Sequence, residues 1–160
     1  MALRNIRVDD DPILRKKARP VTEFNDRLFA LLDDMAETMY KANGVGLAGP
    51  QVGVLRRVVV MDVSEDRNEL LELINPEIVK AEGSQTGNEG CLSLPGLCGT
   101  VTRPMVVQVK AQNRHGQWCL YKGEGLKARC FCHELDHLDG ILYKDKLDAG
   151  TELFRPSEDE

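Results

Sequence analysis

Residues 132–137, Cys132-His133-Glu134-Leu135-Asp136-His137, contain an H-E-x-x-H motif that uses two of the chain's three histidines. Because residues i and i+4 project from one face of an α-helix, His133 and His137 can bind the same divalent ion, and Glu134 can accept a proton from water. The motif therefore predicts a helix that carries part of a metal site. So short a pattern also allows a buried helix whose histidines only pack or form hydrogen bonds.

The residues around the motif predict a helix from about Leu126 to Leu138, which ends at Asp139-Gly140. At about 100° per residue, Leu126 and Cys130 share a sector of this helix with the H-E-x-x-H side chains, and a second sector is apolar. We therefore expect a mostly buried helix with its histidines at the floor of a pocket.

A second helix is predicted near the N-terminus by apolar residues at helical spacing. Thr22 or Asn25 can cap it, and it should end at Asn43-Gly44. The apolar stripe consists of Leu28, Leu31, Leu32, Met35 and Met39.

Most of the remaining apolar segments have the composition of β-strands, with turn residues between them. The expected strands span 57–63, 70–74 (ended by Asn75-Pro76), 77–81, 101–111, 118–121 and 141–143. The turn at 113–116 should join two of them as a hairpin, so antiparallel pairing is expected. The predicted fold class is α+β, with antiparallel strands packed around the central H-E-x-x-H helix and an additional N-terminal helix.

Length and charge restrict the class of protein. The 160 residues suit a single domain over 1–160, whose acidic end, 155–160, is expected to fray. The net charge of −5, from 21 basic and 26 acidic residues, disfavours a nucleic-acid partner. No apolar stretch approaches the roughly 20 residues that span a bilayer, and the N-terminus lacks a signal-peptide pattern. With an odd number of cysteines, we expect reduced thiols in the cytoplasm.

The third metal ligand is less evident than the two histidines. The extended pattern H-E-x-x-H-x-x-G-x-x-H fails because Tyr143 stands at the last position. Cys130 would lie about 10 Å from His137 along the helix axis, too far for a shared ion. Glu152 is a minor candidate, whereas Cys91 lies in the glycine-containing segment 88–96, where backbone can approach a ligand closely.

A Cys-His-His set would leave one position open for water, as in catalytic rather than structural metal sites. Glu134 could accept the proton of that water, so hydrolysis of a carbonyl group is the simplest reaction. Gln51, in the glycine-rich segment 44–53, carries an amide that could stabilise an oxyanion, although the segment could equally be only a turn.

Three motifs in a fixed order resemble those of the peptide deformylase family. They are G-V-G-L-A-G-P-Q at 44–51, E-G-C-L-S at 89–93 and H-E-L-D-H at 133–137. The resemblance covers nearly the whole chain. It implies an α+β enzyme that removes the N-formyl group from nascent polypeptides beginning with formyl-methionine and releases formate.

The resemblance also implies roles for individual residues. Cys91, His133 and His137 would bind the metal, and Glu134 would transfer protons. Gln51 and the backbone N–H of Leu92 would stabilise the oxyanion. The family usually holds Fe²⁺, while Zn²⁺, Ni²⁺ or Co²⁺ can occupy the same ligands, and the softness of thiolate and imidazole does not choose between iron and zinc.

By the same resemblance the substrate adds as a strand beside residues 45–47, so Val45 and Gly46 would contact it. Leu126 and Cys130 would line the methionine pocket, and Glu89 would bind substrate backbone. The alternative for each is an ordinary core or loop position.

The chain also departs from the usual family pattern. Cys98 stands where many members carry arginine, which puts an arginine contact with substrate in doubt, and Gly87 lacks an apolar side chain that some members have. Gly49 and Cys132 replace the more frequent alanine and glutamine. The acidic end does not support ribosome contact through a basic C-terminal helix. Two rival functions remain open: an endopeptidase with Glu152 as third ligand, and a metal-stabilised binding module without turnover.

Overall fold

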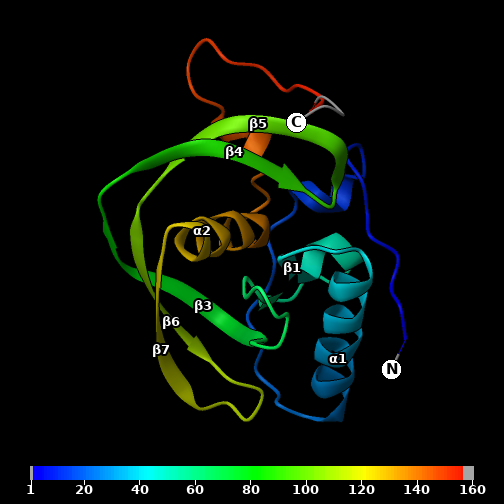
Figure 1. Cartoon of the computed structure of the whole chain (residues 1–160). Coiled ribbons are helices and arrows are strands. Elements are labelled where there is room, and N and C mark those ends of the chain that lie inside the picture. The colour runs from blue at the N-terminus through cyan, green and yellow to red at the C-terminus, as the bar shows by residue number, and fades with distance from the viewer. Residues whose placement is uncertain (1, 157–160) are drawn as a thin grey trace.

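The computed structural model describes residues 2–156 (Figure 1). Its helices are α1 (Asp26–Lys41) and α2 (Leu126–Leu138), and 3-10 turns span Pro12–Arg15 (η1), Gly49–Val52 (η2) and Tyr143–Lys146 (η3). Its strands are β1 (Gly46–Ala48), β2 (Val58–Met61), β3 (Leu71–Glu82), β4 (Gln85–Cys91), β5 (Leu94–Arg103), β6 (Val106–Gln112) and β7 (Trp118–Glu124). All strand pairs are antiparallel, so the α+β class with antiparallel strands is confirmed.

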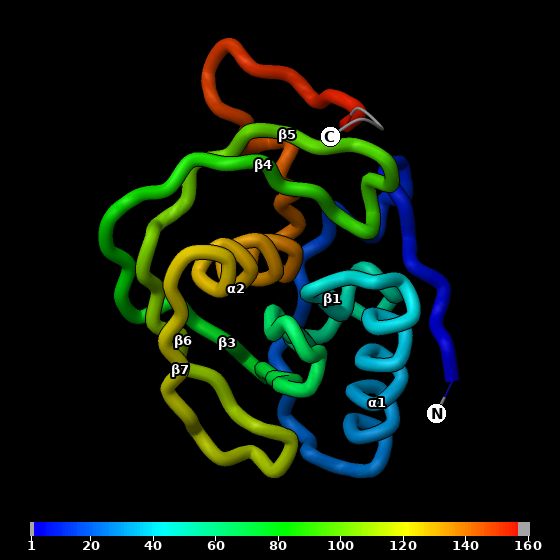
Figure 2. Tube along the Cα trace, viewed as in Figure 1, coloured from blue at the N-terminus to red at the C-terminus, as the bar shows by residue number. Residues whose placement is uncertain are grey.

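The helix α2 lies between two sheets, as the ribbon and the tube both show (Figures 1 and 2). One sheet has five strands in the order β1-β2-β3-β6-β7, and the other is the β4–β5 hairpin. Phe131 and Ala128 of α2 are fully buried against Val107 and Val109 of β6. The helix has the bounds expected from sequence, and its burial on both sides matches its mostly apolar circumference.

The helix α1 covers the end of the five-stranded sheet nearest β1 and β2. Asn25 caps it, because its side chain accepts a hydrogen bond of 3.2 Å from the Leu28 backbone. The predicted apolar stripe is buried against Val58 and Val60.

Two strand predictions were wrong at their boundaries. The strands predicted at 70–74 and 77–81 are one strand, β3, which extends to Glu82, because an irregularity with Asn75 at φ +52° lets the strand continue past the proline. The segment 101–111 is not one strand, because it divides at Pro104 and Met105 into β5 and β6, which belong to different sheets.

The strand predicted at 141–143 was also wrong, since this part of the chain enters the 3-10 turn η3. The short strand β1 and the polar strand β4 were not predicted. Of the tail expected to fray, Arg155 and Pro156 are described, and residues 157–160 lie outside the described residues.

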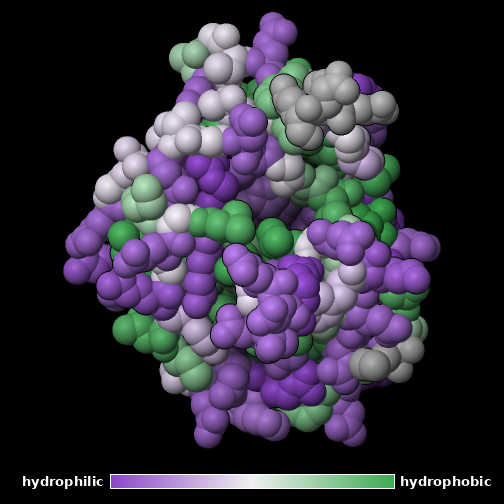
Figure 3. Space-filling model, viewed as in Figure 1, coloured by the Kyte–Doolittle hydropathy of each residue, from purple (hydrophilic) through white to green (hydrophobic). Residues whose placement is uncertain are grey.

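On the face shown in Figure 3, hydrophilic residues predominate and apolar residues form separate patches. Within residues 2–156, no helix is long and apolar enough to span a bilayer.

Candidate metal centre

The two histidines of the H-E-x-x-H motif lie side by side on α2. Their ring centroids are 5.0 Å apart, with the rings at 71° to each other. His137 is 1% exposed and His133 is 7% exposed. Burial lowers the pKa of His137 well below its usual range, so this imidazole is neutral and has a lone pair available.

Cys91, the last residue of β4, completes a cluster with these histidines. Its Sγ lies 3.3 Å from Nε2 of His137, and one ligand atom from each of Cys91, His133 and His137 lies within 4.8 Å of the others. Among residues 2–156, no other group of three or more cysteine, histidine or acidic side chains is arranged so that it could hold a metal ion. We call it the Cys-His-His cluster.

The cluster fits a divalent transition-metal ion. A thiolate and two imidazoles are a donor set typical of iron and zinc. Beside the set, Oε1 of Glu134 is buried and has no hydrogen-bond partner among the described residues. A buried carboxylate oxygen without a partner is costly unless a ligand or water satisfies it, which indicates that this space is built for an occupant.

Buried ion pairs fix the orientation of the His133 ring through its Nδ1 atom. Its Nδ1 lies 2.8 Å from Oε1 of Glu89, whose carboxylate also accepts hydrogen bonds from Arg103 (2.8 and 2.9 Å) and Arg129 (2.7 Å). Burial raises the pKa of Glu89, but the bonds from Arg103 and His133 outweigh burial and lower it to about 2. An ionised carboxylate can only accept, so Nδ1 of His133 donates to it. Burial lowers the pKa of His133, but the bonds to Cys91 and Glu89 outweigh burial and raise it well above its usual range, so a metal binding at Nε2 would displace a proton.

The position of Glu89 differs from the sequence expectation of a contact with substrate backbone. The side chain is buried, and both carboxylate oxygens are bonded to protein groups. The roles of Arg103, Arg129 and Asp136, which bonds Arg103 at 2.8 Å, were missed. The available signal was an arginine at the end of an apolar segment, Arg103, and one inside a mostly buried helix, Arg129, but their convergence on Glu89 depends on the fold.

Glu134 faces the β1 strand at very close range. A Cβ atom added to Gly46 would lie 2.5 Å from Oε2 of Glu134, so a larger residue at position 46 would displace the Glu134 side chain. Burial raises the pKa of Glu134 to about 7, with the charge of His133 opposing this shift and that of Glu89 adding to it. A carboxyl group with a pKa near neutrality can both accept and return a proton.

Gln51 of η2 is held at both ends of its amide. Its Oε1 accepts a hydrogen bond of 2.9 Å from the Ala48 backbone, and its Nε2 donates to Ser93 Oγ at 3.1 Å and lies 3.5 Å from Cys91 Sγ. The side chain is 1% exposed. The amide nitrogen of Gln51 is therefore fixed beside the Cys-His-His cluster, with one N–H donated to Ser93.

A cleft of about 440 Å³ opens beside the cluster. It is lined by Asn43, Gly44, Val45, Gly46, Gln51, Gly90, Cys91, Leu92, Pro95, Gly96, His133 and Glu134. Of the expected substrate contacts, Val45 and Gly46 line this cleft, whereas Leu126 and Cys130 do not. Leu126 is 54% exposed at the start of α2, and Cys130 is buried with its Sγ 3.6 Å from the Val45 carbonyl oxygen.

Two residues considered at the third-ligand position lie outside the cluster: Tyr143, which replaces the last histidine of the extended pattern, and Glu152, the minor candidate ligand. Tyr143 stacks on the His133 ring at 5.8 Å between centroids, and Glu152 is exposed in the C-terminal segment. Neither belongs to the group of side chains that could share an ion.

Comparison with known proteins gives a consistent result. The family model for polypeptide deformylases matches residues 3–152. A peptide deformylase from Lachnoclostridium phytofermentans is 58% identical over 149 residues, covering 93% of this chain and 91% of that protein. One from Alkaliphilus metalliredigens is 57% identical over 147 residues, covering 92% and 98%. The crystal structure of a Legionella pneumophila peptide deformylase, 46% identical, superposes with a TM-score of 0.89 and covers 92% of this chain and 87% of that one.

Proposed function

This chain belongs to the peptide deformylase family, and from that premise we propose how its own residues perform the reaction. As a member it is a metal-dependent hydrolase that removes the N-formyl group from nascent peptides. Water attacks the formyl carbon, the C–N bond breaks, and the products are formate and a peptide with a free amino terminus.

Cys91, His133 and His137 are the residues that hold the metal in this proposal. The observation that carries it is the approach of their three ligand atoms to within 4.8 Å of one another. Ferrous iron is the ion we favour, and zinc, nickel or cobalt suit the same donors. When bound, the ion supplies a Lewis acid that polarises the formyl carbonyl and makes water more acidic.

Glu134 is the proton carrier. It would take a proton from the attacking water and pass it to the departing amine. Its buried oxygen, which has no partner within residues 2–156, and a pKa raised to about 7 support this role, because the same group must be a base in one step and an acid in the next.

Gln51 and the backbone N–H of Leu92 would stabilise the negative charge that develops on the formyl oxygen. Both residues line the cleft, and the bonds from Ala48 and to Ser93 hold the Gln51 amide in place. A donor that is already oriented stabilises an oxyanion without a reorganisation cost during the reaction.

The substrate would bind as an added strand along β1. This strand is at the edge of the five-stranded sheet, paired with β2 on one side, and Val45 and Gly46 belong to the cleft. The methionine side chain would lie against Val45, Leu92 and Pro95. Since nascent chains begin in the cytoplasm, we propose that the enzyme acts there.

The first test is anaerobic purification with metal analysis, followed by a formate-release assay on formyl-Met-Ala-Ser. We expect about one iron ion per chain, and the amount of formate released should equal the amount of free amino terminus formed. Internal cleavage of unformylated peptides without formate would instead favour an endopeptidase. A fully metal-loaded protein without turnover would favour a binding module.

The metal site is tested by Cys91→Ala, which should lose metal and activity together because the thiolate is removed from the donor set. Cys119→Ala is the matched control, since this thiol lies on β7 outside the Cys-His-His cluster. Full metal occupancy in Cys91→Ala would eliminate the assignment.

A further inference from the structure

The C-terminal segment is fixed along the outer side of β5. Cys98 and Phe154 exchange two backbone hydrogen bonds, of 2.8 and 2.9 Å, in an antiparallel bridge. Leu153 packs into the small apolar cluster formed by Leu94, Val101 and Tyr143. In Figure 1 this segment, drawn in red, crosses above β5. These contacts fix the position of the residue that follows, Arg155.

Arg155 lies against the rim of the catalytic cleft. A Cβ atom added to Gly96 would come within 2.9 Å of Nη1 of Arg155, so the guanidinium packs directly on this glycine. Gly96 has φ +76°, which favours glycine, and it lines the cleft together with Pro95. The side chain of Arg155 therefore fills the space that a larger residue at position 96 would occupy.

The charge at this rim is not neutralised within residues 2–156. None of the ion pairs among these residues includes Arg155. The ionisable side chains that line the cleft itself are Cys91, His133 and Glu134, and none of them is a fixed cation free to meet substrate. Arg67, which is bonded to Gly44 of the cleft lining, donates to the Gly44 and Asp62 carbonyl oxygens, so its charge is already engaged by protein groups.

We propose that Arg155 is a specificity-determining residue that favours a carboxylate on the substrate beyond the formyl-methionine. The carboxylate can be an acidic side chain of a nascent chain or the terminal carboxylate of a short peptide. The chain carries a net charge of −5, which repels anionic peptides. A positive charge at the cleft would oppose this repulsion locally and so favour binding of a carboxylate there. This inference rests on the proposed function and refines its substrate class.

The test compares formate release from formyl-Met-Ala-Glu-amide and formyl-Met-Ala-Gln-amide, and from formyl-Met-Ala-Ser as free acid and as amide. The first pair isolates a side-chain carboxylate and the second a terminal one. We expect wild-type kcat/KM to be about two- to fivefold higher for the charged member of at least one pair, through KM, as for an exposed ion pair. The preference should disappear at about 1 M salt, where charges are screened within about 3 Å.

Arg155→Ala should abolish the preference while leaving kcat on the neutral peptides unchanged, and Arg155→Lys should retain most of it. Arg56→Ala is the control, because it removes the same charge from an exposed position remote from the cleft. Equal kcat/KM for charged and neutral peptides in wild type, or an unchanged preference in Arg155→Ala, would overturn the proposal. Failure of the proposed function is distinct, since it would abolish formate release from every peptide.

Discussion

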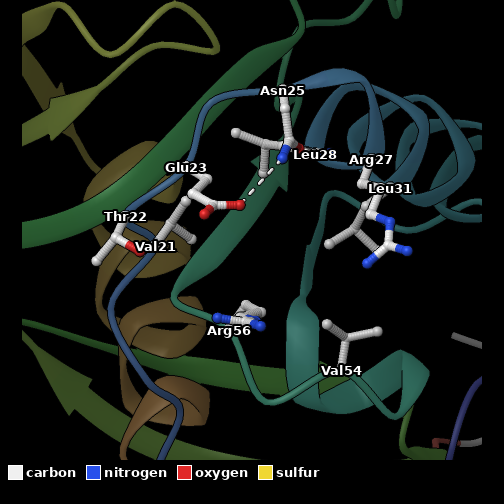
Figure 4. A pocket seen from close by; sticks show the side chains of 9 residues that line it. All are labelled: Val21, Thr22, Glu23, Asn25, Arg27, Leu28, Leu31, Val54 and Arg56. Atoms are coloured by element: carbon white, nitrogen blue, oxygen red, sulfur yellow. Dashed lines mark hydrogen bonds between the residues drawn. The ribbon is translucent and has the colours of Figure 1, made fainter.

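Among the hollows formed by residues 2–156, two are close in size, and one of these two is built for chemistry. The cleft at the Cys-His-His cluster measures about 440 Å³. The second, of about 380 Å³, lies between the segment before α1, the start of α1 and the loop before β2 (Figure 4). Its walls are Val21, Thr22, Glu23, Asn25, Arg27, Leu28, Leu31, Val54 and Arg56.

The hollows differ in how their polar groups are held. At the cleft, buried partners fix the polar side chains: Glu89 orients His133, and Ser93 orients Gln51. In the second hollow, Arg27 and Arg56 are exposed, and the hydrogen bond printed in Figure 4 joins the exposed Glu23 and Asn25 at 3.3 Å. Volume therefore does not distinguish a site, whereas convergent and preorganised polar atoms do.

The largest effect should come from Glu134→Ala. Loss of the proton carrier should lower kcat by about 10²- to 10⁴-fold while metal content stays at the wild-type level, because Glu134 is not a ligand. Metal analysis and formate release on one sample measure both quantities. Glu23→Ala, which removes a carboxylate from the second hollow, should leave kcat unchanged. Near-normal turnover in Glu134→Ala would exclude its proposed role.

The next largest effect is expected for Gln51→Ala. Its kcat should be lower by about 10²- to 10³-fold with metal still bound, because one oxyanion donor is lost. Ser93→Ala separates donation from orientation. It removes the partner that fixes the amide at 3.1 Å but leaves the amide itself, so its kcat should fall less than that of Gln51→Ala. Equal turnover in wild type and Gln51→Ala would remove the amide from the mechanism.

Glu89→Gln should weaken metal binding by about 10- to 100-fold, as expected when the partner that orients a ligating histidine is changed. Competition with a chelator of known affinity measures this loss. Arg27→Ala, in the second hollow, should not change metal affinity. Wild-type affinity in Glu89→Gln would show that His133 is oriented without the carboxylate.

Glu89 should also make stability depend on pH. Its pKa is about 2 in the folded protein, below the usual glutamate value of 4.5, so its ionised form stabilises the fold above about pH 4.5. That contribution is lost as the pH falls from 4.5 towards 2. Urea unfolding of the metal-free protein should therefore show a shallower loss of stability on acidification in Glu89→Gln than in wild type. Identical slopes would contradict the assignment.

Sequence predicted the parts of the cleft that local periodicity determines. The i, i+4 spacing of His133 and His137 and the apolar stripe of α1 each identify a helix, because both patterns are contained within one segment. The glycine-containing segment 88–96 singled out Cys91, and the three motifs of the family assigned it as a ligand by resemblance, since no local pattern indicates that β4 folds over α2.

The parts that sequence did not predict depend on long-range contacts. The continuation of β3 depends on Asn75, whose side chain bonds both backbone groups of Val21, at 2.8 and 2.9 Å, from a distant segment. The strand β4 is polar and rich in glycine, and Glu89 within it is buried because Arg103 and Arg129 approach from other elements. No window of sequence contains both partners of such a contact.

The smallest effect is expected in the second hollow. Arg27→Ala should change the free energy of unfolding by less than about 0.5 kcal/mol, because the side chain is exposed and no ion pair among the described residues includes it. Urea unfolding and kcat/KM on formyl-Met-Ala-Ser measure the two consequences, and both should match wild type. A tenfold loss of kcat/KM would mean that this hollow contributes to catalysis despite its exposed polar groups, and the distinction between the two hollows would then fail.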